Sequence, residues 1–399
     1  MYVTIRESRF RIENHLTMSS ALTQTKHYNT FIPKLRTLMG PGPSDVSPRV
    51  LNALSRSTLG HLDPQFIQLM DEVGELLRYA FKTENSLTMP ISAPGSAGME
   101  ACFANLIEAN DKVAVCINGV FGGRMKENIV RCGGIPIEVT SEWGKQTSVD
   151  ELDAVLSEHK NVKAVAFVHA ETSTGVRNDA AALCAIAKKH HCLTIVDTVT
   201  SLAGIELLVD EWQIDATYSG SQKCLSCVPG LSPVSFSEEA LAVIKSRKTP
   251  VQSWFLDLSL ILGYWGGGAK RAYHHTAPVN SLYALHESLI MIHEEGLENA
   301  WTRHTEKHAQ LCSGLESIGL SFAVDASYRL PQLNVVNIPE GVDDAAVRSE
   351  LLNRYGLEIG AGLGAFAGKV WRIGLMGSAC TEKNIQHCVS SLQEVIKTS

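Results

Sequence analysis

The sequence lacks a strong excess of charge of either sign, and it has no long uninterrupted hydrophobic run. Its 399 residues carry 35 Lys+Arg and 42 Asp+Glu, a formal net charge of −7. Nucleic-acid-binding surfaces need clustered Lys and Arg, which this mildly acidic balance does not supply. The longest uncharged stretches, such as Cys224–Ser237, contain Pro or Gly and never reach the ~20 apolar residues of a membrane span. The composition therefore predicts a soluble protein that binds neither nucleic acid nor a membrane.

A repeated cysteine pattern typical of a disulfide framework or a zinc site is also missing. The 10 cysteines are scattered, and several, such as Cys116 and Cys184, stand inside apolar runs where a free thiol packs as a small hydrophobic group. Cys224 and Cys227 form one C-x-x-C, but no second Cys or His pair accompanies it at zinc-like spacing. This usage is typical of a reducing compartment, so we expect free thiols, no metal and a cytoplasmic protein.

The two ends of the chain carry no recognisable targeting signal. Residues 1–38 mix Arg with Glu and contain no apolar core, unlike a secretory signal or a transit peptide. Met18 is an alternative start, and we expect the segment to be either a mobile end or an arm that lies over a partner subunit. The final KTS differs from the peroxisomal SKL signal, so the expectation of a cytoplasmic protein stands.

From residue 38 onward, short apolar runs alternate with amphipathic segments. Residues 178–191 place apolar side chains on one face and Lys188 and Lys189 near the end, which is typical of an amphipathic helix. Continuous apolar strands separated by helices predict an α/β fold with a mostly parallel sheet covered on both faces. The runs with the length of buried strands are Lys112–Ile117, Val162–Val168 and Leu193–Asp197.

The pattern changes near Glu294, where a long amphipathic segment begins. A smaller C-terminal α/β domain is the simplest explanation of the remaining residues. We therefore predict a large domain over residues 39–295 and a small domain over residues 296–399. The predicted helices of the small domain are Gly296–Ile318, Asp344–Tyr355 and Glu382–Lys397, and its predicted strands are Gln332–Ile338 and Lys369–Gly374.

Two glycine-rich segments could hold a phosphate group. Gly360–Gly368 (GAGLGAFAG) lacks the G-x-G-x-x-G spacing and precedes a strand-like segment, so we reject a dinucleotide-binding motif there. Ser92–Glu100 (SAPGSAGME) follows an apolar stretch and opens a predicted helix over Ala97–Ala109. Backbone N–H groups at Gly95 and Ser96 would then face a phosphate at the positive end of the helix. An ordinary loop with a Ser near the N-cap explains this segment equally well.

The most informative stretch contains Asp197 and Lys223. Asp197 ends a buried strand in LTIVDTVTSLAG, at the edge where open α/β sheets hold ligands, and a carboxylate there is costly unless it is paired. Lys223 follows in ATYSGSQKC, after a short strand and a turn of small residues. Each residue alone has an ordinary structural explanation. Together they suggest one chemical system, because a lysine amine condenses with an aldehyde and a carboxylate keeps a pyridine nitrogen protonated.

These segments resemble the class V group of pyridoxal-phosphate-dependent aminotransferases, of fold type I, and within it the alanine–glyoxylate and serine–pyruvate aminotransferases. The resemblance implies a large domain with a mostly parallel sheet and a smaller C-terminal α/β domain. It extends from residue 38 to the last predicted helix, with the segments in the same order. They are LMGPGPSDVSPRV near the start, INGVFGGR (117–124), HAETSTGV (169–176), SGSQK (219–223), KSRKTPVQSWFLDL (245–258), AYHHTAPVNSLYAL (272–285), EEGLENAW (294–301) and GKVWRIGLMG (368–377).

The resemblance implies pyridoxal 5′-phosphate (PLP) as the cofactor, with four residues near its ring. Lys223 would form a Schiff base with the cofactor aldehyde and, once displaced by the substrate amine, carry the proton between Cα and C4′. Asp197 would pair with the pyridinium nitrogen. Phe121 stands where many relatives stack a Trp on the pyridine face. Thr172 matches a hydroxyl residue that bonds the phenolic oxygen.

The resemblance also implies how the cofactor phosphate is held. Tyr273 and Thr276 match residues that reach the phosphate from the neighbouring subunit. We therefore expect a homodimer in which each active site is built from two chains. The phosphate-binding positions within one chain fall on Gly95, Ser96, Ala97 and Gln222.

Substrate recognition is expected from Arg372 and Gly42. Arg372 matches the arginine that holds the substrate α-carboxylate through a two-pronged charged pair. Trp371 and Ile373 alternate with it along the predicted strand, so the arginine should point to the opposite face. Gly42, in the GPGPS turn, matches a position close to the substrate, where a residue without Cβ leaves room.

The resemblance implies transfer of an amino group from a small L-amino acid, alanine or serine, to glyoxylate or a similar 2-oxo acid. One alternative is another class V enzyme, such as a phosphonate aminotransferase or a cysteine desulfurase. A desulfurase needs a mobile reactive thiol over the site, and Cys380 is the candidate, although a packed side chain is the simpler explanation. The other alternative is a non-catalytic binding protein on this fold. The joint presence of Asp197, Lys223 and Arg372 argues against it.

Overall fold

The structure, a computed structural model, describes residues 28–266 and 271–398. The chain divides into two units, residues 1–35 and 36–399. In the first unit only residues 28–35 are described, and they form neither helix nor strand. The expectation of an arm over residues 1–38 therefore lies largely outside the described residues. The helices and strands of the described residues all belong to the second unit.

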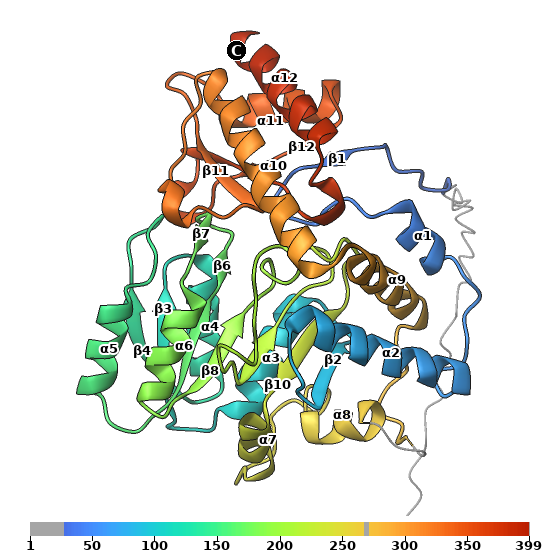
Figure 1. The fold of residues 1–399 in the computed structure, drawn as a ribbon, viewed down its shortest axis with the longest axis vertical. Helices are drawn as coiled ribbons and strands as arrows, with labels where there is room; N and C mark the ends of the chain where they lie inside the picture. The colour runs from blue at the N-terminus through green and yellow to red at the C-terminus, as the bar shows by residue number, and fades with distance from the viewer. Residues whose placement is uncertain (1–27, 267–270, 399) are drawn as a thin grey trace, which may run out of the picture. The chain divides into compact units, whose positions relative to one another are not determined.

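A seven-stranded sheet forms the centre of the second unit (Figure 1). Its strand order is β2-β10-β9-β8-β5-β3-β4. Neighbours from β9 to β4 run parallel, whereas β10 is antiparallel to both β9 and β2. The mostly parallel sheet confirms the expected α/β fold, and the three strands predicted from apolar runs have the predicted bounds. The strands are β2 (Leu87–Ile91), β3 (Lys112–Ile117), β4 (Ile135–Thr140), β5 (Val162–Val168), β8 (Leu193–Asp197), β9 (Ala216–Tyr218) and β10 (Ser232–Phe236).

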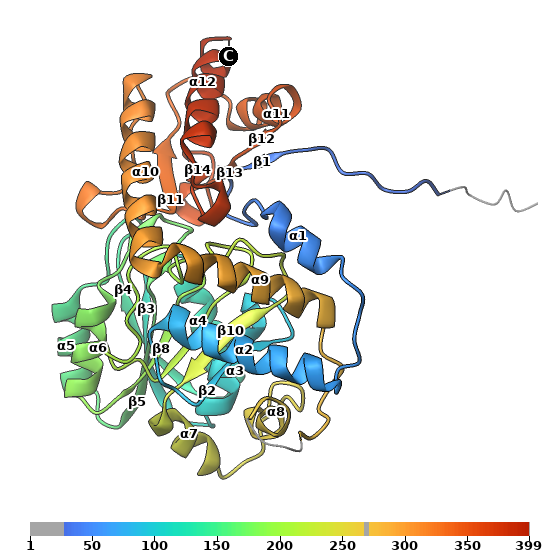
Figure 2. The same cartoon turned by 45° about the vertical axis from the view of Figure 1, so that its right-hand side comes forward.

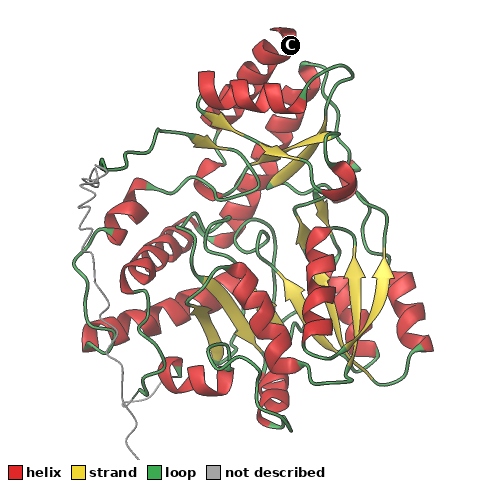
Figure 3. Ribbon diagram, turned by 180° about the vertical axis from the view of Figure 1, so that it is seen from behind, coloured by secondary structure: helices red, strands yellow, loops and turns green. Residues whose placement is uncertain are grey.

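Helices connect these strands and cover both faces of the sheet (Figure 1, Figure 3). α4 packs on β3, β4 and β5, α3 packs on β9 and β10, and α6 packs on β8 and α5. The helix predicted over 178–191 is confirmed, but it starts two residues later and ends two residues earlier. The Asp179 side chain caps its start by accepting the Ala182 amide. The helices are α3 (Gly95–Leu106), α4 (Val120–Arg131), α5 (Val149–Glu158) and α6 (Ala180–Lys189), and a small hairpin is formed by β6 (Ala170–Glu171) and β7 (Val176–Arg177).

A further group of helices covers the β2 end of the sheet. α2 and α9 lie side by side, and α1 packs on α9 (Figure 2). The Asp63 side chain caps α2 by accepting the Gln65 amide, and Pro64 stands in the first turn, where no helical hydrogen bond is lost. The helices are α1 (Pro48–Leu54), α2 (Pro64–Phe81), α7 (Glu238–Lys245), α8 (Leu258–Trp265) and α9 (Val279–Glu295).

The C-terminal part of the chain packs around a hydrophobic cluster of its own. Its sheet has the order β11-β14-β13. Met39 joins this cluster, and β1 pairs in parallel with β12, a contact that the sequence did not predict. The division of the chain between residues 295 and 296 stays a prediction. The elements are β1 (Thr37–Leu38), α10 (Leu297–Ser317), β11 (Leu333–Asn337), α11 (Asp344–Arg354), β12 (Leu357–Glu358), β13 (Gly360–Ala361), β14 (Val370–Gly374) and α12 (Glu382–Thr398), with three short 3₁₀ turns, η1 (Ala326–Tyr328), η2 (Gly364–Phe366) and η3 (Gly377–Ala379).

The predicted helices and strands of this part are confirmed to within one residue at each end. The glycine-rich segment 360–368 contains β13 and η2 and leads directly into β14, so no helix follows it. That order confirms the rejection of a dinucleotide-binding motif there. No helix among the described residues has the length and apolar character needed to cross a lipid bilayer.

Candidate active site

A cavity of about 160 Å³ lies at the carboxyl ends of β5, β8 and β9. Open α/β sheets hold ligands at this edge. The structure brings the SAPGS segment and the Asp197–Lys223 pair together there, although they are distant in the sequence. Of the predicted site residues, those that line the cavity are Gly95, Ser96, Phe121, Thr172, Asp197, Gln222 and Lys223.

Asp197 ends β8 and is almost fully buried, with 4% of its surface exposed. The Tyr218 hydroxyl, from the register partner on β9, donates to Oδ2 at 2.8 Å, and the Val199 amide donates to Oδ1 at 2.9 Å. Burial raises the pKa of Asp197 to about 6, while these two donors and the charges of Lys223 and Arg124 lower it. A buried carboxyl group whose pKa is raised by burial and lowered by nearby donors and cations is suited to pairing with a cationic nitrogen.

Lys223 stands in the turn between β9 and β10, and its amine donates to the Pro41 carbonyl. Burial is the main cause that lowers the pKa of Lys223 to about 8. Gly42 lies against the same amine with φ +100°, and a Cβ there would be 2.5 Å from Nζ. The lysine side chain therefore occupies the room that Gly42 leaves, and its amine is partly neutral near neutral pH.

The first turn of α3 forms another side of the cavity. The helix begins at Gly95 after Pro94, and no described side chain caps it. Gly95 and Ser96 line the cavity, whereas Ala97 stands just outside it and donates its amide to the Pro94 carbonyl at 2.8 Å. A Cβ at Gly95 would lie 3.3 Å from the Ser219 carbonyl oxygen, so the helix start is close to the lysine turn. Uncapped amides at the positive end of a helix attract phosphate.

Phe121 is presented by the first turn of α4, and Glu171 from β6 holds that turn. Oε2 of Glu171 accepts the Phe121 amide at 3.1 Å and the Gly122 amide at 3.3 Å. Oε1 accepts the Ser173 amide at 3.0 Å and its hydroxyl at 2.6 Å. Burial raises the pKa of Glu171 to about 7, although these donors lower it. Glu171 thus replaces the missing side-chain cap of α4 and fixes the aromatic ring at the cavity wall.

Thr172 follows Glu171 and connects the cavity wall to Arg372 on β14. Nη1 of Arg372 donates to the Thr172 carbonyl at 3.4 Å, and Nε donates to the Ala361 carbonyl at 2.7 Å. Trp371 and Ile373 pack in the C-terminal hydrophobic cluster, which confirms the predicted alternation along the strand. Arg372 is therefore held by backbone carbonyl groups, with 7% of its surface exposed.

Tyr273 and Thr276 do not meet the other predicted residues within this chain. Tyr273 is 62% exposed, and its hydroxyl lies 3.4 Å from the Thr276 hydroxyl. Between them, the His275 ring nitrogen Nε2 lies 2.7 Å from the Ser92 hydroxyl, which ties this loop to the SAPGS segment. The expected contact of the two hydroxyl groups with a neighbouring subunit stays a prediction.

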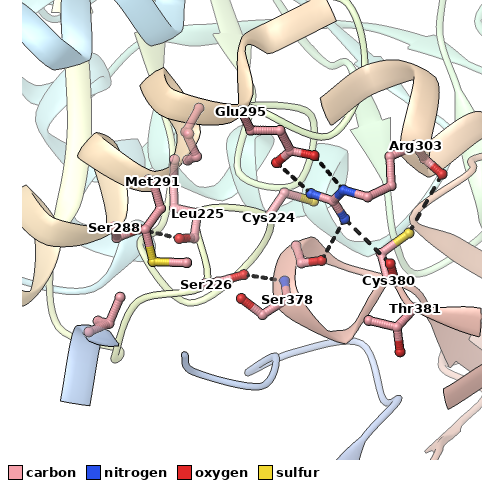
Figure 4. Close-up of a pocket in the computed structure, with 13 residues that line it drawn as sticks. Cys224, Leu225, Ser226, Ser288, Met291, Glu295, Arg303, Ser378, Cys380 and Thr381 are labelled. Carbon is pink, nitrogen blue, oxygen red and sulfur yellow. Dashed lines mark hydrogen bonds and ion pairs between the residues drawn. The ribbon is translucent and has the colours of Figure 1, made fainter. Parts of the chain in front are cut away.

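A second cavity, of about 200 Å³, is lined by Cys224, Arg303 and Cys380 (Figure 4). Arg303 bonds the Glu295 carboxylate through Nε at 2.5 Å and Nη2 at 2.9 Å. Burial raises the pKa of Cys380 to about 11, so its thiol stays protonated. Cys380 thus lines a different cavity from Lys223 and lacks the low pKa of a reactive thiol.

The C-x-x-C pair has no reactive thiol either. Burial raises the pKa of Cys224 and of Cys227 to about 12. Within the described part of the chain, no group of three or more His, Cys, Asp or Glu side chains is placed to hold a metal ion. Both cysteines are packed side chains of the core.

The residues around the first cavity fit a phosphorylated pyridine aldehyde. Lys223 supplies a buried amine, Asp197 supplies a buried carboxyl group, and α3 supplies an uncapped helix start. The buried amide oxygen of Gln222 has no hydrogen-bond partner among the described residues, so this side chain is free to turn. Its NH2 group is the end that could donate to a phosphate, because a phosphate oxygen only accepts. These groups match the needs of PLP: an amine for the aldehyde, an anion for the ring nitrogen and donors for the phosphate.

Three residues of the site were not identified from the sequence: Tyr218, Glu171 and Arg124. Tyr218 could have been found from strand pairing, because it ends the short strand that follows the Asp197 strand. Glu171 and Arg124 stand in the segments HAETSTGV and INGVFGGR. The resemblance brings these two segments to the same cofactor through Phe121 and Thr172, but it assigns no role to Glu171 or Arg124.

Comparison with known proteins identifies the family. Residues 48–386 match the family described as Aminotransferase class-V. The alanine–glyoxylate aminotransferase of Drosophila melanogaster is 41% identical over 372 residues, which cover 92% of this chain and 94% of that protein. The (S)-ureidoglycine–glyoxylate transaminase of Bacillus subtilis (strain 168) is 38% identical over 382 residues, 91% of each chain. The chain belongs to the class V aminotransferase family.

A solved structure agrees with this assignment. The alanine–glyoxylate aminotransferase from Nostoc sp. superposes with a TM-score of 0.91 at 44% identity, covering 94% of this chain and 98% of that one. The chain therefore has the fold type I architecture and is a transaminase. The resemblance drawn from the sequence segments is confirmed at the level of family, fold and reaction class. The family also implies PLP as the cofactor.

Proposed function

We propose that this transaminase moves the amino group of a small L-amino acid, alanine or serine, to glyoxylate or a similar 2-oxo acid, with PLP in the cavity at Lys223. The observation that carries the proposal is the meeting of Lys223, Asp197 and the uncapped start of α3 in one cavity. The Drosophila and Bacillus relatives are both named for glyoxylate, which supports it as the acceptor. Their names differ in the amino donor.

When bound, PLP supplies an aldehyde that reacts with amines and a pyridine ring that withdraws electrons from the substrate carbon. The groups that line the cavity can hold such a molecule from three sides. An aromatic side chain can cover one face of the pyridine ring, a carboxylate can meet its nitrogen, and the amides at a helix start can bind its phosphate. In our proposal the ring is held by Phe121, Asp197 and Thr172, and the phosphate by Gly95, Ser96, Ala97 and Gln222.

Lys223 is the proposed proton carrier. Its pKa of about 8 leaves a useful fraction of the amine neutral near neutral pH, and only the neutral amine can take a proton from the substrate Cα at Nζ. Asp197 has the complementary task, because its negative charge keeps a proton on the ring nitrogen. Tyr218 and Val199 hold the Asp197 carboxylate in place through hydrogen bonds to both oxygens.

Arg372 is the proposed anchor for the substrate carboxylate. Burial lowers the pKa of Arg372, and the charge of Glu171 opposes this effect. The guanidinium donates to backbone carbonyl groups and forms no ion pair with any described carboxylate. A buried cation without a counter-ion gains most from a ligand that brings one. An α-carboxylate matches the planar guanidinium in charge and shape. Gly42 would leave room for the Lys223 side chain and, once the substrate amine has displaced that side chain, for the substrate.

We further propose that the active protein is a homodimer. The exposed hydroxyl groups of Tyr273 and Thr276 lie beside each other and outside their own chain's cavity, which supports a role at the phosphate of a partner's site. The large part, residues 39–295, and the small part, residues 296–399, are the proposed domains that position Lys223 and Arg372 respectively.

The assignment of Lys223 is tested by Lys223→Ala. The wild type should absorb in the visible range with PLP, shift its band on addition of L-alanine, and give a borohydride-trapped peptide that contains Lys223. The variant should bind PLP without a covalent link and lose essentially all turnover. Lys245→Ala, an exposed lysine at the end of α7, should behave as the wild type. Wild-type turnover by Lys223→Ala would falsify the catalytic assignment.

The substrate proposal is tested by a panel of amino donors against 2-oxo acid acceptors. We expect L-alanine or L-serine with glyoxylate to give the highest kcat/KM. (S)-Ureidoglycine belongs in the panel, because a relative of 38% identity is named for it. Preference for a dicarboxylic donor such as aspartate would contradict the proposal, because Arg372 is the only cation we assign to a substrate carboxylate.

A further inference from the structure

One positive charge at the cavity has no role in the proposed function. Among the described residues that line the cavity, the cationic side chains are Lys223 and Arg124. In the proposed function the Lys223 amine is committed to the aldehyde. Arg124 lies near the phosphate positions instead, with Nη1 3.5 Å from the Ser96 hydroxyl. The guanidinium is thus placed beside the group of the cofactor that carries the most negative charge.

The position of Arg124 follows from helix α4. Phe121 and Arg124 are three residues apart, so the helix presents both on the same face. The guanidinium carbon of Arg124 lies 5.0 Å from the centre of the Phe121 ring. α4 also packs against α3, whose first turn contains Ser96. Arg124 therefore bridges the aromatic wall and the phosphate end of the cavity.

The charge of Arg124 acts on the buried Asp197 only at a distance. Arg124 forms no ion pair with a carboxylate in the described part of the chain, whereas Arg131 on the same helix pairs with Glu127 at 3.3 Å. A phosphate monoester carries about −1.5 to −2 charges at pH 7, and a helix start contributes only about half a positive charge. The helix alone therefore leaves much of the phosphate charge unmatched, and Arg124 is the nearby cation that can match it.

We propose that Arg124 donates to the phosphate group of the bound cofactor and so selects the phosphorylated form of the vitamer over the unphosphorylated one. This inference rests on the proposed function of the cavity, and it adds a residue that the family resemblance did not assign. The guanidinium would also stay over the Phe121 ring, so one side chain would support both the stacking residue and the phosphate.

The test compares two ligands that differ only in the phosphate. Full-length protein freed of bound cofactor is dialysed to equilibrium against graded concentrations of PLP or of pyridoxal, and the bound fraction is read from the visible absorbance. Arg124→Gln should weaken PLP binding about tenfold, since a hydrogen bond to a charged group contributes about 1.5 kcal/mol or more. Its affinity for pyridoxal should stay within about twofold of the wild type. Arg124→Lys keeps the charge, so its affinity for PLP should lie between those of the wild type and Arg124→Gln.

Two controls separate this role from a structural one. Arg131→Gln removes an exposed arginine from the same helix and should leave both affinities unchanged. Because Arg124 is exposed, Arg124→Gln should unfold at the wild-type temperature. An equal loss of affinity for PLP and pyridoxal would mean that Arg124 acts only through Phe121, and unchanged PLP binding would mean that it does not reach the phosphate. Either result overturns the inference, whereas a wild type that binds neither ligand overturns the proposed function itself.

Discussion

Burial shifts the pKa values of the two ionisable groups of the cavity in opposite directions. It raises the pKa of Asp197 to about 6 and lowers the pKa of Lys223 to about 8. Both changes favour the neutral form, because a charge loses its hydration in the cavity. A cationic ring nitrogen would restore the charged form of Asp197, and an aldehyde needs the neutral form of Lys223. At the scale of single residues, the site is therefore suited to a ligand that carries both groups.

Gly42→Ala tests the close contact at the lysine. The new Cβ would fall 2.5 Å from Lys223 Nζ and 2.8 Å from its Cδ, at a φ of +100° that only glycine adopts readily. We expect the amine to be displaced, turnover to fall at least about tenfold and stability to fall by about 1 kcal/mol. Steady-state kinetics and the absorbance of the lysine–PLP adduct measure the effect.

Gly60→Ala is the matched control, because a Cβ at Gly60 has no described atom within 4 Å and its φ lies outside the glycine-favouring region. It should keep wild-type turnover. Normal kinetics in Gly42→Ala would show that the lysine side chain can move aside without cost, contrary to this interpretation.

At the scale of elements, the start of α4 depends on a carboxylate from another part of the chain. Glu171 accepts the Phe121 and Gly122 amides because α4 has no side-chain cap of its own. The same segment carries Thr172, whose carbonyl accepts Arg372. Two adjacent buried residues thus link the aromatic wall of the cavity to the proposed substrate arginine.

Glu171→Ala should therefore affect both stability and cofactor binding. It leaves buried amides without acceptors, which costs about 1–3 kcal/mol for each unsatisfied group. We expect a loss of about 3 kcal/mol in the free energy of unfolding and weaker binding of both PLP and pyridoxal, because Phe121 loses its fixed position. Urea unfolding and the dialysis assay measure the two effects. Glu171→Gln keeps one acceptor oxygen and should lose less; equal losses in the two variants would argue against hydrogen bonding as the cause.

A second element-scale contact joins α10 to η3, the turn after β14. His304 is fully buried, and its Nε2 accepts the Gly377 amide at 3.0 Å while Nδ1 lies 2.6 Å from the Ala300 carbonyl. The Ser226 hydroxyl accepts the Ser378 amide at 2.7 Å, which ties the same turn to the loop after Lys223. This geometry needs a neutral His304 with its proton on Nδ1.

The need for a neutral His304 makes the stability of the protein depend on pH. Burial lowers the pKa of His304 to about 4 in the folded protein, below the ordinary value of 6.5. The unfolded chain therefore takes up this proton first, so the contribution of His304 is complete above pH 6.5 and is lost as the pH falls toward 4. His304→Gln should be less stable at pH 7 and should lose less stability between pH 6.5 and 4, with a slope smaller by up to about 1.4 kcal/mol per pH unit.

Denaturant unfolding of the two proteins at several pH values measures this difference. Taking the difference cancels the other buried groups, such as Glu171 and His308, provided that they behave alike in both proteins. Parallel curves for wild type and variant would mean that His304 does not carry this linkage.

At the scale of the whole molecule, the proposed shared site makes a prediction about mixed dimers. Lys223→Ala destroys the site that contains its own lysine, whereas a Tyr273→Ala/Thr276→Ala variant would destroy the site of its partner. A hybrid of the two chains then has one intact site. Refolding an equal mixture should recover about a quarter of wild-type activity from two nearly inactive proteins. Absence of recovery, with hybrids demonstrated by mass spectrometry, would contradict a shared site.

Much of the fold could be predicted locally. Apolar runs gave β3, β5 and β8 their bounds, because a strand buried on both faces must be apolar throughout. The helix predicted over 178–191 starts two residues later in the structure, where the Asp179 side chain caps it. The pairing of β1 with β12 could not be predicted, because two-residue strands leave no periodicity to detect. Glu171 was missed because its partners are about fifty positions earlier in the chain and its bonds are to their backbone amides.

The order of apolar and charged segments was sufficient by itself to predict the α/β fold and the Asp197–Lys223 pair, because strand burial and lysine–aldehyde chemistry both restrict residue type at a given place in the chain. The family followed from the resemblance of the quoted segments. Only the tertiary structure decided which groups share the cavity and what their charges do there. It brought Arg124 to Ser96 and Glu171 to α4, and it moved the pKa values of Asp197 and Lys223 toward each other. The physical reason is that desolvation and backbone hydrogen bonding depend on neighbours in space, which the order of residues along the chain does not specify.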